Sequence, residues 1–182
     1  MIAGENTPDG LPLDLALVGE LGRRVAREQA LRSVAATDVQ TTTRQTLDLL
    51  LTQEDAENTA WLKRLVGERG WPGRTLVGDA GAHAVWLLAQ HADGDPVFQE
   101  ACLELLSSAV AEGEAAPADL AYLDDRVRVA RGEPQRYGTQ CEQDDSGRWH
   151  PLPLAEPDHA DRLRADVGLE PLAIYLARMA EL

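Results

Sequence analysis

Residues 82–92, AHAVWLLAQHA, constrain the fold more than any other part of the chain. A helix made of this segment would be apolar around nearly its whole circumference, and such a helix has to be buried. The run DGDP follows at 93–96, where it can end one helix and cap the next with proline at its first position. The sequence therefore predicts a central helix over about residues 79–92.

The rest of the chain shows mostly helical spacing of its apolar residues. Further helices are predicted from Asp14, from Asp38, from Thr52 or Asp55 to Gly70, over 95–112 and 117–132, and near 157–167 and 171–181. Residues 136–152 depart from this period and contain two short strand-like segments around a Gly-containing turn, which predicts a β-hairpin. Residues 1–12 are predicted to be a disordered tail. The expected fold is mainly α: one compact multi-helix domain over 13–182 with a small β-hairpin near 136–152.

The charge of the chain limits its partners. Lys and Arg number 17 against 31 Asp and Glu, which gives a formal net charge of −14. Such a surface repels nucleic acid phosphates and anionic membranes, so neither is expected as a partner. Simple solubility and a specific cationic partner both remain open as reasons for this charge. No leader pattern and no apolar run of roughly 18 residues is present, which predicts a cytoplasmic protein.

Patterns for nucleophilic, redox or cofactor chemistry are absent from the sequence. It contains no GxSxG elbow, no P-loop and no GxGxxG after a strand, and no cofactor is expected. Cys102 and Cys141 lack a CxxC partner, and Cys102 lies in an apolar helical stretch that is typical of a small buried residue.

The predicted central helix carries polar groups that an ordinary buried helix avoids, namely His83, Gln90 and His91, with Asp93 just beyond. Such groups need hydrogen-bond partners, because an unpaired one costs about 1–3 kcal/mol. The nearest candidates are Asp125, Arg126, Gln135, Tyr137, Thr139 and Gln140. Imidazole titrates near neutrality, so His91 is the candidate for proton transfer. The alternative is a structural histidine that joins two helices through a carboxylate.

The same region also contains possible metal ligands. His91, Asp93 and Asp95 offer one nitrogen and two carboxylates within five residues, and Asp125 could complete the set. The DGDP run is also an ordinary helix stop followed by an N-cap, however, and no histidine lies four residues from His91. The spacing does not supply the ligands of a zinc site, so no metal is predicted.

Six motifs occur in consistent order over residues 52–176. They are Gly70-Trp71-Pro72, Val77-Gly78, Gln90-His91-Ala92-Asp93 with Gln99, Asp125-Arg126-Val127, Gln135-x-Tyr137-Gly138-Thr139-Gln140, and Val167-Gly168-Leu169. Together they resemble the DUF6624 family of small bacterial proteins of unknown function. The resemblance implies no reaction, but it implies that QHAD, DR and QxYGTQ belong together. The family commonly has paired arginines shortly before VGL. This sequence has Leu163 and Arg164 there, with Arg162 one place earlier.

We therefore expect a cavity shared by the central helix, the helix over 117–132 and the hairpin. The catalytic candidates are His91, Asp125 and Tyr137. The substrate-binding candidates are Gln90, Asp93, Arg126, Gln135, Thr139, Gln140 and Trp71. The expected substrate is a small polar molecule or peptide, and the expected reaction is a metal-independent hydrolysis or related acid–base step with His91 as general acid or base. The alternatives are a binding module without chemistry and a purely structural polar network.

Overall fold

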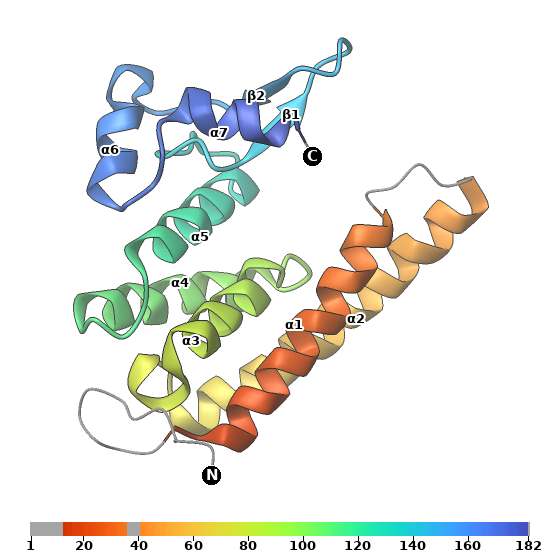
Figure 1. Cartoon of the computed structure of the whole chain (residues 1–182), viewed down its shortest axis with the longest axis vertical. Coiled ribbons are helices and arrows are strands. Elements are labelled where there is room, and N and C mark those ends of the chain that lie inside the picture. Colours follow the sequence, from red (N-terminus) through yellow and green to blue (C-terminus); the bar gives the residue numbers. More distant parts are fainter. Residues whose placement is uncertain (1–12, 36–40, 182) are drawn as a thin grey trace. The chain divides into compact units, whose positions relative to one another are not determined.

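The chain divides into two compact units, and a pair of long helices belongs to the first of them. The computed structural model describes residues 13–35 and 41–181, and its contacts divide the chain into Met1–Ala115 and Ala116–Leu182. In the first unit, α1 (Leu15–Ala35) and α2 (Thr41–Arg69) lie side by side and antiparallel (Figure 1). Their core includes Leu21 and Leu62, which are fully buried. The expected tail at 1–12 and the expected cap Asp38 lie outside the described residues.

The helix break expected near Thr52 or Asp55 is wrong, because α2 runs through both positions to Arg69. The Thr52 hydroxyl donates to the Asp48 carbonyl oxygen at 2.8 Å, and the Thr59 hydroxyl donates to that of Asp55 at 2.7 Å. Threonine can satisfy its hydroxyl inside a helix in this way, so the TQED run does not have to act as a cap. The predicted stop at Gly70 is confirmed, since Gly70 has a φ of 72°.

The predicted central helix is α3 (Arg74–Gln90), which packs against α1 and α2. Gly78 interrupts it with φ 72° and ψ 173°, so its main part starts at residue 79 as expected. Val85, Leu88 and Ala89 are almost completely buried, which confirms the burial inferred from the apolar run. The next helix, α4 (Pro96–Ala111), has its predicted N-cap, because the Asp95 side chain accepts from the Phe98 amide at 3.1 Å.

The second unit contains the remaining helices and the β-hairpin. Its elements in chain order are α5 (Pro117–Ala130), β1 (Cys141–Gln143), β2 (Trp149–Pro151), η1 (Pro157–His159), α6 (Ala160–Asp166) and α7 (Leu172–Met179). The strands pair antiparallel, with Glu142 opposite His150. In the connecting turn Asp144 Oδ1 accepts from the amides of Ser146 and Arg148. The expected mainly α fold with a small β-hairpin is confirmed.

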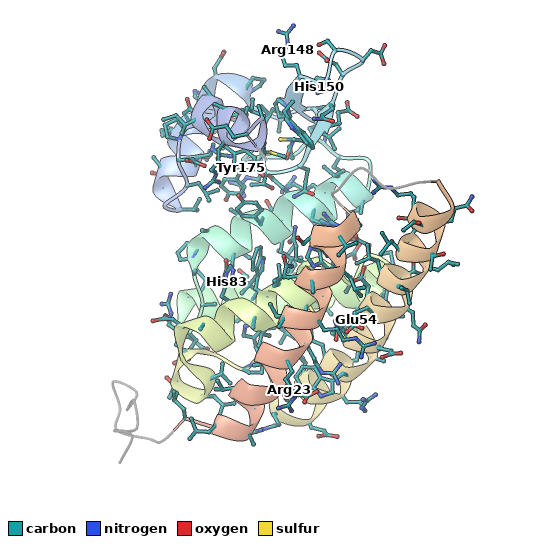
Figure 2. The ribbon with its side chains drawn as sticks, turned by 45° about the vertical axis from the view of Figure 1, so that its right-hand side comes forward. Arg23, Glu54, His83, Arg148, His150 and Tyr175 are labelled. Atoms are coloured by element: carbon teal, nitrogen blue, oxygen red, sulfur yellow. The ribbon has the colours of Figure 1, made fainter. Side chains whose placement is uncertain are left out.

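Helix α7 packs in the second unit through its one buried residue, Tyr175. This ring lies at the side of α7 that is nearer to α5 (Figure 2). It meets Tyr122 of α5 edge-on with 6.3 Å between the ring centroids. No helix in residues 13–35 and 41–181 combines the length and the apolar character that crossing a membrane requires.

Candidate functional site

A pocket of about 570 Å³ lies where α3 ends beside α2. His91 is the residue that ends α3, and it forms part of the pocket wall. All residues that line the pocket belong to the first unit. They are Thr52, Asp55, Ala56, Thr59, Ala60, Lys63, His91, Asp93, Gly94 and Asp95.

A buried carboxylate on α1 holds the imidazole of His91. Nδ1 of His91 contacts Oε1 of Glu28, whose side chain is 0% exposed. The His91 side chain is 16% exposed, and its Nδ1 is buried. Nδ1 is therefore the ring nitrogen that faces the Glu28 carboxylate.

Arg32 links this pair to a second wall of the pocket. Its Nε donates to Glu28 Oε1 at 2.8 Å, and its Nη2 lies 2.9 Å and 3.0 Å from the two carboxylate oxygens of Asp55. The polar chain Asp55–Arg32–Glu28–His91 thus runs from α2 through α1 to the end of α3. Both of its ends, Asp55 and His91, line the pocket.

The two carboxyl groups of this chain have pKa values shifted in opposite directions. Burial by itself would raise the pKa of Glu28, but the hydrogen bond and charge of His91 and those of Arg32 outweigh it, so this pKa is lowered. Burial raises the pKa of Asp55, with a smaller contribution from the charge of Glu28, and the opposing charge of Arg32 does not cancel the effect. Glu28 is therefore the ionised partner that His91 meets.

Glu28→Gln is expected to reduce the loss of unfolding free energy that the first unit undergoes as the pH falls. Because folding lowers the pKa of Glu28 below its usual 4.5, the ionised group stabilises the fold above that pH. This contribution is lost as the pH falls through the folded value. The difference in unfolding free energy between wild type and variant should be largest near neutral pH and should shrink in acid. Urea unfolding from about pH 7 to about pH 3 measures it. If the difference in unfolding free energy stays constant over this range, the lowered pKa of Glu28 is contradicted.

The turn after His91 is held by a buried amide. Gln99 is 2% exposed. Its Nε2 donates to the carbonyl oxygens of Ala89 and Gln90 at 3.2 Å and 3.1 Å and to Asp93 Oδ1 at 3.1 Å. Lys63 Nζ lies 2.6 Å from Asp95 Oδ2 across the pocket wall. In the described part of the chain, no three His, Cys, Asp or Glu side chains are grouped so that they could hold a metal ion.

Two of the predicted binding residues of the first unit lie away from this wall. Gln90 is 5% exposed and is not among the lining residues. Trp71 lines a different cavity, of about 720 Å³, together with Thr75, Glu112 and Glu114. The structure thus brings His91 and Asp93 into one pocket and places Gln90 and Trp71 outside it.

The predicted residues of the second unit form a network around the loop 136–140. Asp125 of α5 is 0% exposed. Its Oδ1 accepts from the amides of Arg136 and Tyr137 at 2.7 Å and 3.1 Å, and its Oδ2 accepts from the amide and hydroxyl of Thr139 at 2.9 Å and 3.0 Å. Burial raises the pKa of Asp125 although these hydrogen bonds oppose the shift. Both oxygens are committed to the loop, which is the environment of a structural carboxylate.

Gln135 and Gln140 continue this network. The Gln135 side chain, 0% exposed, donates to the carbonyl oxygens of Gln140 and Leu152 at 2.8 Å and accepts from the Gln140 amide at 2.9 Å. Arg126 Nη1 donates to Gln140 Oε1 at 3.2 Å. Tyr137 is half-buried, and burial raises the pKa of its hydroxyl. Asp125, Arg126, Gln135, Tyr137, Thr139 and Gln140 are therefore brought together, as a set that shapes one loop.

Two residues that the sequence reasoning did not assign to the site hold the same loop from α6 and α7. Arg164 is 0% exposed, and it donates from Nη1 to the Tyr137 carbonyl oxygen at 2.7 Å and from Nε to that of Glu170 at 2.6 Å. The Tyr175 hydroxyl donates to the Thr139 carbonyl oxygen at 3.1 Å. The loop thus has its amides bound by Asp125 and its carbonyl groups bound by Arg164 and Tyr175.

Gly138→Ala is expected to destabilise the second unit by about 1–3 kcal/mol. Gly138 has a φ of 71°, and a Cβ there would lie 3.0 Å from Leu172 Cδ1. Gly147 is the matched control, because it has a φ of 79° but nothing within 4 Å of its Cβ position. Gly147→Ala should therefore show the backbone strain alone and cost less. Urea unfolding measures the free energy of unfolding of both variants. Equal losses of this free energy would show that the contact with Leu172 adds nothing to the cost of Gly138→Ala.

His91 has a partner that the sequence analysis did not name, because the contacting carboxylate is Glu28 of α1. Sequence reasoning also missed Arg32, Asp55 and Lys63. One signal was available for Glu28, since it follows Leu17 and Leu21 at helical spacing on the buried side of α1. A glutamate at such a position needs a buried partner. The expected sharing of one cavity with the segments around Asp125 and Tyr137 stays a prediction.

Comparison with known proteins places the chain in a family. The model of the family of unknown function DUF6624 matches residues 17–181, nearly the whole chain. No curated protein and no solved structure matches it. The family match includes the segments that build the His91 pocket and those that hold the loop 136–140. The chain therefore belongs to the DUF6624 family.

Proposed function

We propose that the pocket beside His91 is the active site of an acid–base enzyme that hydrolyses a small polar substrate. The observation that carries this proposal is the contact between a pocket-lining imidazole and a fully buried carboxylate, His91 with Glu28. A carboxylate behind one ring nitrogen fixes the tautomer and stabilises the imidazolium form, which is the arrangement that general-base histidines use. The proposal places this activity in the cytoplasm, in keeping with the two free thiols of Cys102 and Cys141.

The proton transfers follow from the orientation of the ring. Glu28 accepts the hydrogen bond of Nδ1–H, so the neutral ring carries its lone pair on Nε2. Nε2 takes a proton from a water molecule as the water oxygen forms a bond to the electrophilic carbon of the substrate. The imidazolium then returns this proton to the leaving group as the scissile bond breaks, so that Nε2 is again unprotonated at the end of the cycle. Glu28 does not touch substrate and acts as a positioning residue.

Hydrolysis of a panel of p-nitrophenyl esters with small polar acyl groups tests the proposal. His91→Asn keeps an amide N–H where Nδ1 meets Glu28 but removes Nε2, the nitrogen that acts as the base in this proposal. It should lower kcat/KM by about 100-fold or more. The matched control is His159→Asn, since His159 also contacts a carboxylate, Glu156 at 2.8 Å, but is exposed. This control should retain the wild-type rate.

Two results would count against the proposal. Wild-type protein that hydrolyses no ester faster than the solvent does, but is stabilised by a bound ester, would favour the binding module. Equal losses of rate in His91→Asn and His159→Asn would show that any reaction is that of exposed imidazole groups.

A further inference from the structure

A second cavity lies at the other end of α3 from His91. Its volume is about 720 Å³, within the range of roughly 300–1,000 Å³ that is typical of pockets for small ligands. It is lined by residues at the start of α3, in the C-terminal part of α4 and in the turn after α4, all of them in the first unit. The residues that line the His91 pocket do not line this cavity. The reaction proposed for His91 therefore does not use it.

The side chain of Trp71 brings an unused hydrogen-bond donor to this cavity. Trp71 follows Gly70, precedes Pro72 and is half-buried. Its indole Nε1 is buried and has no hydrogen-bond partner among the residues that the structure describes. Buried polar atoms in folded proteins nearly always have a partner, so an unpaired one calls for an explanation. A ligand in the cavity that carries a hydrogen-bond acceptor would provide the missing partner.

The remaining wall is mainly apolar and is held in place by a carboxylate. Its apolar lining residues are Trp71, Leu76, Leu105 and Ala109. Glu114 accepts through Oε2 from the Thr75 amide at 2.8 Å and through Oε1 from the Thr75 hydroxyl. A Cβ at Gly73 would collide with this carboxylate, so glycine allows it to approach the start of α3. These contacts fix the turn after α4 to α3, and the cavity is therefore formed before any ligand binds.

The charges of the wall favour a neutral ligand. Of the described residues that line the cavity, Glu112 and Glu114 are ionisable and none is Lys, Arg or His. An anionic ligand would be repelled by the two carboxylates. A protonated amine has only donors, and the indole N–H is itself a donor, so the two cannot form a hydrogen bond. A neutral oxygen acceptor on an apolar body meets both conditions.

We propose that this cavity binds a small neutral molecule with an apolar body and a carbonyl oxygen, and that the indole N–H of Trp71 donates to this oxygen. The apolar body would lie against Leu76, Leu105 and Ala109. The site is separate from the His91 pocket, and its occupation does not depend on the reaction proposed there.

Titration of the full chain with cyclohexanone and with methylenecyclohexane tests the hydrogen bond. The two probes have nearly the same shape, but only the ketone carries an acceptor. The Nε1–H NMR signal of Trp71 should move downfield as cyclohexanone binds, because the proton gains an acceptor, and it should not do so with methylenecyclohexane. Trp71→Phe keeps an aromatic ring but lacks the N–H. It should lower the ratio of cyclohexanone affinity to methylenecyclohexane affinity by about two- to tenfold, the range for one neutral hydrogen bond.

Trp149→Phe is the matched control, because Trp149 lies in β2 of the second unit and does not line the cavity. It should leave the affinity ratio of the two probes unchanged. Protonated cyclohexylamine and cyclohexanecarboxylate should each bind more weakly than cyclohexanone.

Three results would overturn the proposal. They are a Trp71 Nε1–H signal that cyclohexanone does not move or that both neutral probes move alike, an affinity ratio in Trp71→Phe equal to that of wild type, and a charged probe that binds as tightly as the ketone. If Trp71→Phe does not fold, the Nε1–H signal of the wild-type protein and the charged probes decide the matter.

Discussion

Replacement of Asp125 by alanine is expected to destabilise the second unit by about 4 kcal/mol. The variant removes the acceptor of four hydrogen bonds from the loop 136–140, three from backbone amides and one from the Thr139 hydroxyl. Asp125 is 0% exposed, so water cannot easily replace the carboxylate. Each donor left unsatisfied in a buried place costs about 1–3 kcal/mol, and partial relaxation of the loop recovers some of this energy.

The neighbouring residue provides the control for this change. Asp124 is half-buried and accepts from Arg128 Nε at 3.0 Å on the same helix. Asp124→Ala should cost less than about 1 kcal/mol, as helical ion pairs near the surface do. Urea unfolding with hydrogen exchange measured over residues 116–182 compares the two variants in the correct unit. Similar losses of unfolding free energy in Asp125→Ala and Asp124→Ala would mean that Asp125 does not hold the loop 136–140.

Glu28→Ala is expected to destabilise the first unit by about 3 kcal/mol. Glu28 is fully buried between His91 and Arg32, and its removal leaves the polar groups of both without their shared carboxylate. Truncation of one partner of a buried pair costs more than the pair itself contributes, because the remaining groups stay desolvated. The partial exposure of Arg32, 31% of its side chain, places this loss at the lower end of the range for buried pairs.

Glu20→Ala on the same helix is the matched control. Glu20 pairs with Arg23 and Arg24, and its side chain is 30% exposed. Its removal should cost about 0.5 kcal/mol, as expected for a solvated ion pair. Unfolding free energies of the two variants at neutral pH make the comparison. A Glu28→Ala protein as stable as Glu20→Ala would show that the buried network contributes no stability.

Local patterns were sufficient to predict most of the fold. The apolar run 82–92 identified the buried helix, and DGDP identified both its end and the cap of α4. Glycines marked the ends of helices where positive φ angles occur, as at Gly70. The threonines of α2 were misread as a helix start because the sequence alone does not show whether a hydroxyl binds an amide ahead of it or a carbonyl behind it.

The candidate site depends on contacts between residues that are distant in sequence, and there the sequence was less informative. His91 and Glu28 are 63 positions apart and Arg32 lies 23 from Asp55, so no spacing rule connects them. His91 and Asp93 could be singled out because they are polar groups at the end of an apolar helix. The set of Asp125 and the YGTQ segment was predicted to lie together, and it does. Its role in holding a loop became visible only when the partner of each carboxylate oxygen was known.

The protonation state of the His91 ring tests the account most directly. Two-bond nitrogen–proton NMR spectra distinguish the two neutral tautomers of each histidine. With Glu28 ionised behind Nδ1, neutral His91 should carry its proton on Nδ1 and show the signal of an unprotonated Nε2. A proton on Nε2 in the neutral ring would place the lone pair against Glu28, and His91 could not then act as the base in the pocket.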